Sequence, residues 1–107
     1  MIEKLFEYST ADTKAIERII SDGNTDLNHM VLPKGGALPI HNSNSNVYMI
    51  VIRGILTVKL GDQDPNKYGK GTILNIPYDT RMDVFNENEE VMEMFVIKAP
   101  SPYNYPK

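Results

Sequence analysis

The chain has 107 residues, of which 41% are hydrophobic and 23% charged, the ordinary composition of one globular domain. Its formal net charge of −3 and its 11 lysines and arginines, spread along the chain, exclude a basic surface, so we expect no nucleic-acid partner. The absence of cysteine excludes disulfides, thiolate metal sites and cysteine nucleophiles. No apolar run approaches the ~20 residues that span a bilayer, and no secretory signal opens the chain. We therefore expect a cytoplasmic protein that does not bind membranes.

The first segment with periodic apolar residues is ambiguous. Ser9 and Asp12 have the spacing of a helix-capping box, and the alanines and isoleucines of residues 11–20 form a helical stripe. Against a helix, the sequence SDGN at residues 21–24 is a hairpin signal that leads directly into the next strand. We favour a strand over residues 16–21, and the helix remains the alternative.

The rest of the chain predicts short strands separated by turns about every ten residues, a pattern typical of a sandwich or barrel. The expected strands are residues 26–32, 47–53, 55–60, 72–77, 81–86 and 90–99. Residues 61–66 (GDQDPN) form a loop and residues 69–71 (GKG) a tight turn. The three prolines of the tail, residues 100–107, favour an extended conformation.

Two blocks of residues carry a family resemblance. In the first, Gly35 is followed after five residues by His41, and a polar stretch leads into a strand that ends at Gly54. The second block contains Gly71, Pro77 and Asn86 at matching spacings.

Together these blocks resemble the paired motifs of the cupin family. The resemblance implies an all-β fold, a double-stranded β-helix (jelly-roll) barrel of two antiparallel sheets. It covers residues 27–99 of a single domain, 1–107. Residues 1–26 would lie at the edge of the barrel and residues 100–107 would form the tail. Because small cupins commonly pair through such N-terminal segments, the resemblance also implies a homodimer, and the apolar strand 47–52 supports a buried outer face.

The metal ligands of the family are mostly replaced. Cupins that bind metal use a histidine pair and a glutamate from the first block and a histidine from the second. The corresponding residues here are His41, Ser43, Val47 and Met82. A single imidazole does not hold a transition metal, so we expect no metal site and no cofactor.

Alternation along the strands directs one set of side chains into the barrel. The expected ligand-binding residues are His41, Ser43, Val47, Met49, Met82 and Val84, with Tyr78 at the mouth. We predict metal-independent binding of a small, partly apolar molecule. One alternative is a metal-independent isomerase or epimerase with His41 as base and Tyr78 as acid, and whether the protein is an enzyme stays open.

A third alternative is a metal-dependent enzyme with non-standard ligands, for which His29 or Glu93 would have to turn inward. The alternation of His29 with apolar neighbours favours a half-buried residue with satisfied hydrogen bonds. Glu93 lies between two methionines and is either an edge residue or a buried carboxylate that needs a partner. A purely structural or partner-binding role also remains open.

Overall fold

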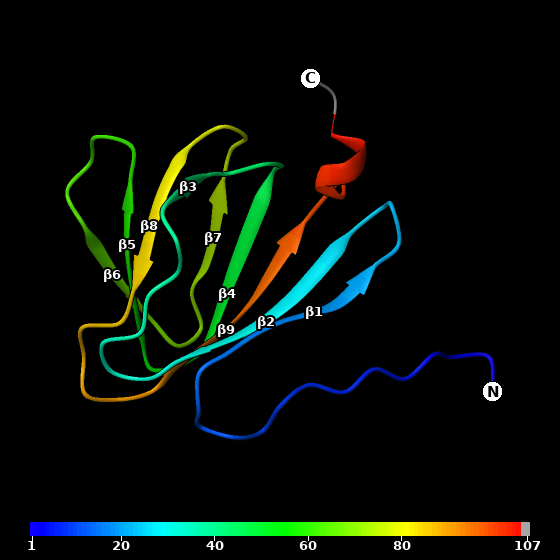
Figure 1. Cartoon of the computed structure of the whole chain (residues 1–107), viewed down its shortest axis with the longest axis horizontal. Helices are drawn as coiled ribbons and strands as arrows, with labels where there is room; N and C mark the ends of the chain where they lie inside the picture. The colour runs from blue at the N-terminus through cyan, green and yellow to red at the C-terminus, as the bar shows by residue number, and fades with distance from the viewer. Residues whose placement is uncertain (106–107) are drawn as a thin grey trace.

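A computed structural model of the protein describes residues 1–105. It contains two antiparallel sheets that face each other, as a double-stranded β-helix requires (Figure 1). The larger sheet has the strand order β1-β2-β9-β4-β7, and the smaller has the order β3-β8-β5-β6. The elements are β1 (Ala15–Ser21), β2 (Asp26–Leu32), β3 (His41–Asn42), β4 (Val47–Arg53), β5 (Ile55–Leu60), β6 (Asn66–Gly69), β7 (Ile73–Ile76), β8 (Arg81–Phe85), β9 (Met92–Lys98) and the 3-10 helix η1 (Pro102–Asn104).

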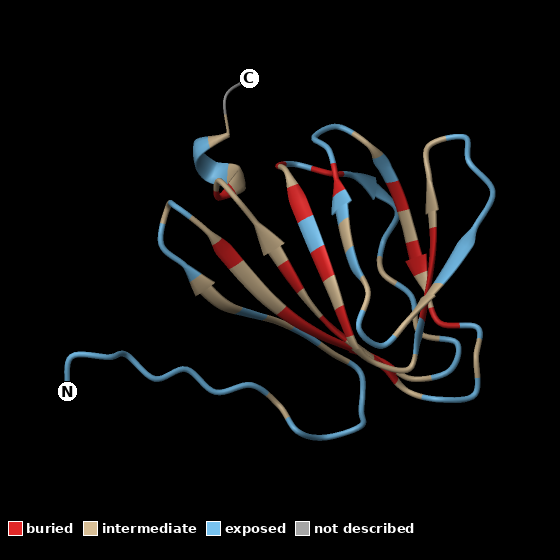
Figure 2. Ribbon diagram, turned by 180° about the vertical axis from the view of Figure 1, so that it is seen from behind, coloured by how far each residue is buried: buried red, intermediate tan, exposed pale blue. Residues whose placement is uncertain are grey.

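The core fills the space between the two sheets. Buried and less buried residues alternate along β4, β8 and β9 (Figure 2). Val47 and Met49 on β4 and Met82 and Val84 on β8 are all buried in this core, as the alternation predicts. Tyr48 lies on the opposite face of β4 and is 37% exposed, also as expected.

The ambiguous N-terminal segment is a strand, and the alternative of a helix is wrong. β1 pairs with β2 along its whole length and forms the edge of the larger sheet. The hairpin turn decides this, because the Asp22 carboxylate accepts hydrogen bonds from the backbone N–H groups of Asn24 and Thr25, both at 3.0 Å. Gly23, which follows Asp22 in the turn, adopts a φ of +86°, which few other residues tolerate.

Two strands were not predicted, the two-residue β3 and the strand β6. β6 falls between the loop and the tight turn expected from the sequence, and pairs with β5 at the edge of the smaller sheet. Its sequence, NKYG, has no alternation of apolar and polar residues, so the strand exists because β5 offers it a backbone edge.

The prediction of an extended tail is wrong in part. Residues 102–104 form η1, with Pro102 at its first position, where a missing N–H is tolerated. The preceding Ser101 is buried, and its hydroxyl donates to the Asp26 carboxylate at 2.9 Å. The tail is therefore anchored to β2, and its last two residues lie outside the described part.

The structure explains the residue type at one position of each motif block, Gly54 in the first and Asn86 in the second. Gly54 adopts a φ of +73°, and a Cβ placed there would lie 2.2 Å from the Val91 carbonyl oxygen, so only glycine fits. Asn86 is buried, and its amide nitrogen donates to the carbonyl oxygens of Leu32 and Glu90, both at 2.8 Å. These contacts hold the connections that enter and leave the smaller sheet.

No helix within residues 1–105 is long and apolar enough to cross a membrane. The cytoplasmic location stays a prediction.

Candidate functional site

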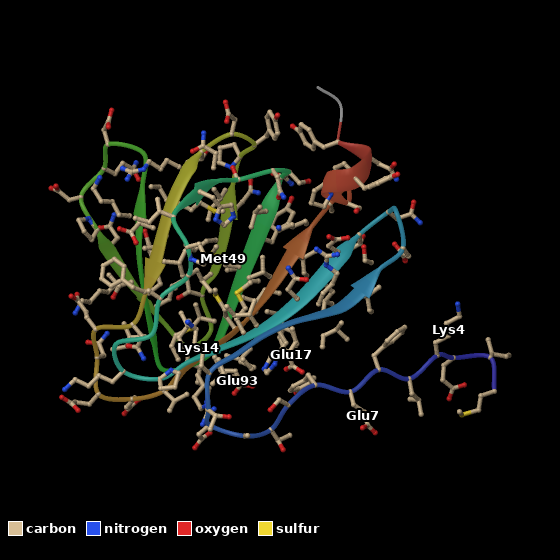
Figure 3. The ribbon with its side chains drawn as sticks, in the orientation of Figure 1. Lys4, Glu7, Lys14, Glu17, Met49 and Glu93 are labelled. Carbon is tan, nitrogen blue, oxygen red and sulfur yellow. The ribbon has the colours of Figure 1, made fainter. Side chains whose placement is uncertain are left out.

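The barrel encloses a small cavity of about 50 Å³ between the two sheets. It is lined by Met30, Leu38, Pro39, His41, Val47, Met49, Met82, Val84, Val96 and Lys98. Five of the seven residues predicted to bind a ligand are among them, whereas Ser43 and Tyr78 are not. Figure 3 shows Met49 pointing into this space. The cavity is therefore mostly apolar, with an imidazole and an ammonium group as its polar members.

His41 lies on β3, the shortest strand, and is exposed on one side. Its Nδ1 is 2.9 Å from the carbonyl oxygen of Pro39, which can only accept a hydrogen bond. In the neutral ring this contact places the proton on Nδ1 and leaves Nε2 as an acceptor. His41 can thus accept a hydrogen bond from a ligand.

The residues around His41 do not fit a transition metal. Its partner across the strand pair is Met82, and the other cavity residues are aliphatic, thioether or ammonium groups. Three or more histidine or carboxylate ligands would be needed, and no such cluster occurs within residues 1–105. We therefore derive no chemistry through a bound metal.

Ser43 and Tyr78 belong to a second pocket, which the sequence did not separate from the first. The Ser43 hydroxyl donates to the Pro77 carbonyl oxygen at 2.6 Å and accepts from the Thr80 N–H at 2.8 Å. The ring of Tyr78 stacks on Tyr105, with centroids 4.3 Å apart. This mouth pocket, about 450 Å³, is lined by Asn42, Ser43, Asn44, Tyr78, Asp79, Pro102, Tyr103 and Tyr105. Ser43 mainly holds the turn, and Tyr78 does not share a cavity with His41.

The sequence reasoning missed five cavity residues, Met30, Leu38, Pro39, Val96 and Lys98, of which Lys98 is the charged one. Lys98 ends β9 on the face that points into the barrel, and it is half-buried. Burial lowers the pKa of its ammonium group, because the charged form loses water. The alternation over residues 92–98 contained the signal, since every second residue there faces inward.

The outer face of the larger sheet carries a second polar group of residues. The side chain of His29 is fully buried, not half-buried as predicted. Its Nδ1 is 2.8 Å from Glu17 Oε1 on β1, and its Nε2 is 2.6 Å from Glu93 Oε2 on β9. Figure 3 shows both glutamates on the side of the N-terminal segment. His29 and Glu93 therefore face away from the cavity, contrary to the inward arrangement that the third alternative requires.

Arg53 extends this network to β4. Its Nε donates to Glu93 Oε1 at 3.1 Å and its Nη1 to Asp12 Oδ1 at 2.8 Å. These carboxylates, with Asp12 the larger influence, raise the pKa of the guanidinium group. Glu17, His29, Arg53 and Glu93, which we name the outer-face cluster, thus connect four strands.

The N-terminal segment packs on the outer-face cluster. The ring of Tyr8 lies 4.5 Å from the His29 ring, measured between centroids. The backbone N–H of Ser9 donates to Glu17 Oε1 at 3.0 Å. The hydrogen bond from His29, and then that from Ser9, lowers the pKa of Glu17. The cluster therefore fixes the point at which the N-terminal segment meets the sheet.

Comparison with known proteins decides the family, although no family model matches the sequence. The uncharacterized protein MJ0764 of Methanocaldococcus jannaschii is 42% identical over 103 residues, a match that spans 95% of this chain and 89% of the relative. The crystal structure of MJ0764 is that of an RmlC-like cupin family protein with a double-stranded β-helix fold. It superposes with a TM-score of 0.93 at 41% identity and covers 96% of this chain and 95% of that one. The chain belongs to the RmlC-like cupin family.

More distant cupins share the fold alone. A cupin 2 conserved barrel domain protein from Salinispora arenicola is 15% identical, with a TM-score of 0.70 over 85% of this chain and 79% of that one. A cupin superfamily protein from Desulfitobacterium hafniense is 9% identical, with a TM-score of 0.73 over 87% and 83% of the two chains. The relatives confirm the expected barrel, and the function has to be argued from the site.

The outer-face cluster predicts how stability depends on pH. Because the pKa of Glu17 is lower in the folded protein than its unfolded value of about 4.3, the ionised carboxylate stabilises the fold above that pH. The stabilisation is lost as the pH falls through the folded pKa. Glu17→Gln should therefore lower the melting temperature at pH 7, and its deficit relative to the wild type should be smaller near pH 3. The measurement is thermal unfolding followed by circular dichroism at both pH values.

Glu7→Gln is the matched control, since Glu7 is an exposed carboxylate on the N-terminal segment that precedes β1 (Figure 3). It should melt with the wild type at both pH values. A Glu17→Gln deficit that grows in acid would contradict the stabilising role of the ionised carboxylate.

Proposed function

We propose that this cupin binds a small, partly apolar molecule in its barrel without a metal ion. The observation that carries the proposal is the composition of the cavity, in which apolar side chains surround His41 and Lys98. Ligand sites commonly combine an apolar lining with a few polar groups that fix orientation. Here Nε2 of His41 would accept a hydrogen bond from the ligand, and Lys98 would donate one.

The size of the cavity requires that ligand binding moves side chains. At about 50 Å³ it is far below the roughly 300 Å³ of a typical ligand pocket. Three of its residues, Met30, Met49 and Met82, have flexible thioether side chains that repack readily. We infer that these methionines change rotamer to admit the ligand.

An isomerase or epimerase would need a second acid–base group beside His41. Within the described chain, the candidate in the same cavity is Lys98 rather than Tyr78. The pairing of His41 with Tyr78 stays a prediction, and the geometry favours binding over this chemistry.

Benzyl alcohol, an apolar ring with one hydroxyl group, is a suitable probe of the barrel. In protein labelled with ¹³C at the methionine methyl groups, its addition should shift the resonances of Met30, Met49 and Met82, which line the cavity. Met92 and Met94 are buried but lie outside the cavity lining, so their resonances should move much less. The measurement is a titration followed by methyl NMR spectra.

The exposed Met1 in the same spectra controls for non-specific association. Equal shifts at all six methionines, or none at the three that line the cavity, would contradict binding in the barrel.

Metal-independent binding predicts that protein purified without chelator contains well under one transition-metal ion per chain. The physical reason is the donor set at His41, which lacks the additional imidazole and carboxylate ligands that such ions require. The measurement is elemental mass spectrometry of untagged protein. A stoichiometric metal removed by His41→Ala would show that His41 finds other ligands.

We further propose that the protein is a homodimer whose N-terminal arms, residues 1–7, pack on the partner subunit. The arm leaves the sheets in an extended conformation (Figure 1), with Ile2 104%, Leu5 74% and Phe6 51% exposed. The outer face of the larger sheet is itself apolar, with side chains of Tyr48, Ile50, Ile52, Phe95 and Ile97. A chain that carries both surfaces can exchange arms symmetrically with a second copy.

Deletion of residues 1–7 should convert the dimer to a monomer, because it removes the exposed apolar side chains and leaves Tyr8 on His29. The measurement is light scattering coupled to size-exclusion chromatography. Replacement of the exposed Glu3, Lys4 and Glu7 by serine is the control, which should stay dimeric. A full-length monomer, or a dimer that survives the deletion, would contradict this role of the arm.

A further inference from the structure

A third pocket lies between the β1–β2 hairpin and the C-terminal η1, which sits beyond the end of β9 (Figure 1). Its volume is about 430 Å³. We name it the tail pocket, and it is lined by Arg18, Ser21, Gly23, Asp26, Asn44, Lys98, Ser101, Pro102 and Tyr103. None of these residues was predicted from the sequence to bind a ligand. Most of these residues carry polar side chains, whereas most residues of the barrel cavity are apolar.

Two cations of the tail pocket have no anionic partner in the described part of the chain. Neither Arg18 nor Lys98 forms a side-chain hydrogen bond or an ion pair within residues 1–105. Lys98 is half-buried, and burial lowers the pKa of its ammonium group, with a smaller contribution from the nearby charge of Arg18. A charged group that has lost water without gaining a partner reduces the stability of the fold. A bound anion would reverse this effect.

The carboxylate of the pocket is already engaged. Asp26 is 4% exposed, and its Oδ1 accepts hydrogen bonds from the hydroxyl groups of Ser21 at 2.7 Å and Ser101 at 2.9 Å. Its charge attracts Lys98 from a distance beyond that of an ion pair. With Arg18 and Lys98 positive and Asp26 negative, the lining has a formal charge of +1. This charge matches one carboxylate better than a phosphate dianion.

Lys98 connects the tail pocket to the barrel. It is the one residue that lines both the tail pocket and the barrel cavity in the described chain. A ligand whose apolar part lies among the methionines would therefore place a polar end group at Lys98.

We propose that the tail pocket binds a carboxylate attached to an apolar body, with Lys98 and Arg18 as the recognising cations and the body in the barrel. The inference rests on the proposed function, because the apolar part of the ligand would lie in the barrel. It adds the chemical class of the ligand, a small organic acid. Asn44, which also lines the pocket, offers an amide donor for a carboxylate oxygen.

Benzoate and benzyl alcohol, which share a ring and differ in charge, test this inference by calorimetric titration. Charge-assisted hydrogen bonds predict that benzoate binds about tenfold or more tightly than benzyl alcohol. Lys98→Met, which keeps the apolar stem and removes the charge, should abolish this preference by weakening benzoate binding much more than benzyl alcohol binding. Arg18→Met should also weaken benzoate binding, because it removes the second cation of the tail pocket. Lys70→Met, at an exposed turn, is the control with the same change in net charge and should behave as the wild type.

A stability measurement separates recognition from a structural role. Because the charge of Lys98 is half-buried and unpaired by residues 1–105, Lys98→Met should raise the melting temperature of the ligand-free protein. If Lys98 instead stabilised the fold, Lys98→Met would lower the melting temperature. Saturating benzoate should raise the melting temperature of the wild type more than that of Lys98→Met.

Each contrary outcome is distinguishable. If benzyl alcohol binds as tightly as benzoate, the carboxylate site is overturned and the barrel function stands. If benzoate keeps its preference in Lys98→Met, the assignment of Lys98 is overturned. If neither compound binds, the barrel function and the carboxylate site are both overturned.

Discussion

The buried imidazole of His29 is the interaction on which the arrangement of the larger sheet depends. It bridges Glu17 on β1 and Glu93 on β9 from the strand between them, and Arg53 connects Glu93 to β4. Each ring nitrogen of His29 contacts one of the two carboxylates, so one side chain connects both neighbouring strands. Replacing His29 would leave the largely buried Glu93 carboxylate without one of its two partners, which is costly in a low-dielectric environment. The cluster thus holds together strands that come from both ends of the chain.

Because the outer-face cluster lies on the outer face of the larger sheet, its charged residues do not occupy the barrel cavity. The inner face of the same sheet packs against the smaller sheet so closely that only about 50 Å³ remains between them. Methionine is an unusual choice for a rigid core but suits a surface that must adapt. The polar groups that reach this space, His41 and Lys98, lie where the two sheets open toward solvent. In the proposed function, these two groups would orient the ligand at this opening.

The tail contributes to that mouth more than its composition indicates. Ser101 is buried against Asp26, and Ser45 donates to the carbonyl oxygen of Pro100. These contacts hold η1 over the end of β9, where Pro102 and Tyr103 line both the mouth pocket and the tail pocket. A segment rich in proline and tyrosine, next to a half-buried lysine, thus becomes part of a candidate recognition site.

The sequence by itself determined the features that follow from local backbone geometry. Side chains alternate across a strand with a period of two, so the inward positions of Val47, Met49, Met82 and Val84 could be read without coordinates. Gly54 was predictable in the same way, because a strand that ends at a fixed spacing before a tight turn favours glycine. The order of strands and turns indicated a sandwich or barrel, and the resemblance of the two motif blocks to cupins implied the barrel.

Only the tertiary structure decided which distant residues meet. His29 lies 12 residues from Glu17 and 64 from Glu93, and their contact depends on the register of three strands. The division of the expected site into separate pockets, with Tyr78 away from His41, depends on how the tail packs. Strand alternation assigns a side chain to a face but gives neither its depth along the barrel nor its neighbour on another strand. For that reason the sequence revealed the barrel and its apolar lining, while the outer-face cluster and the cations of the tail pocket required the folded chain.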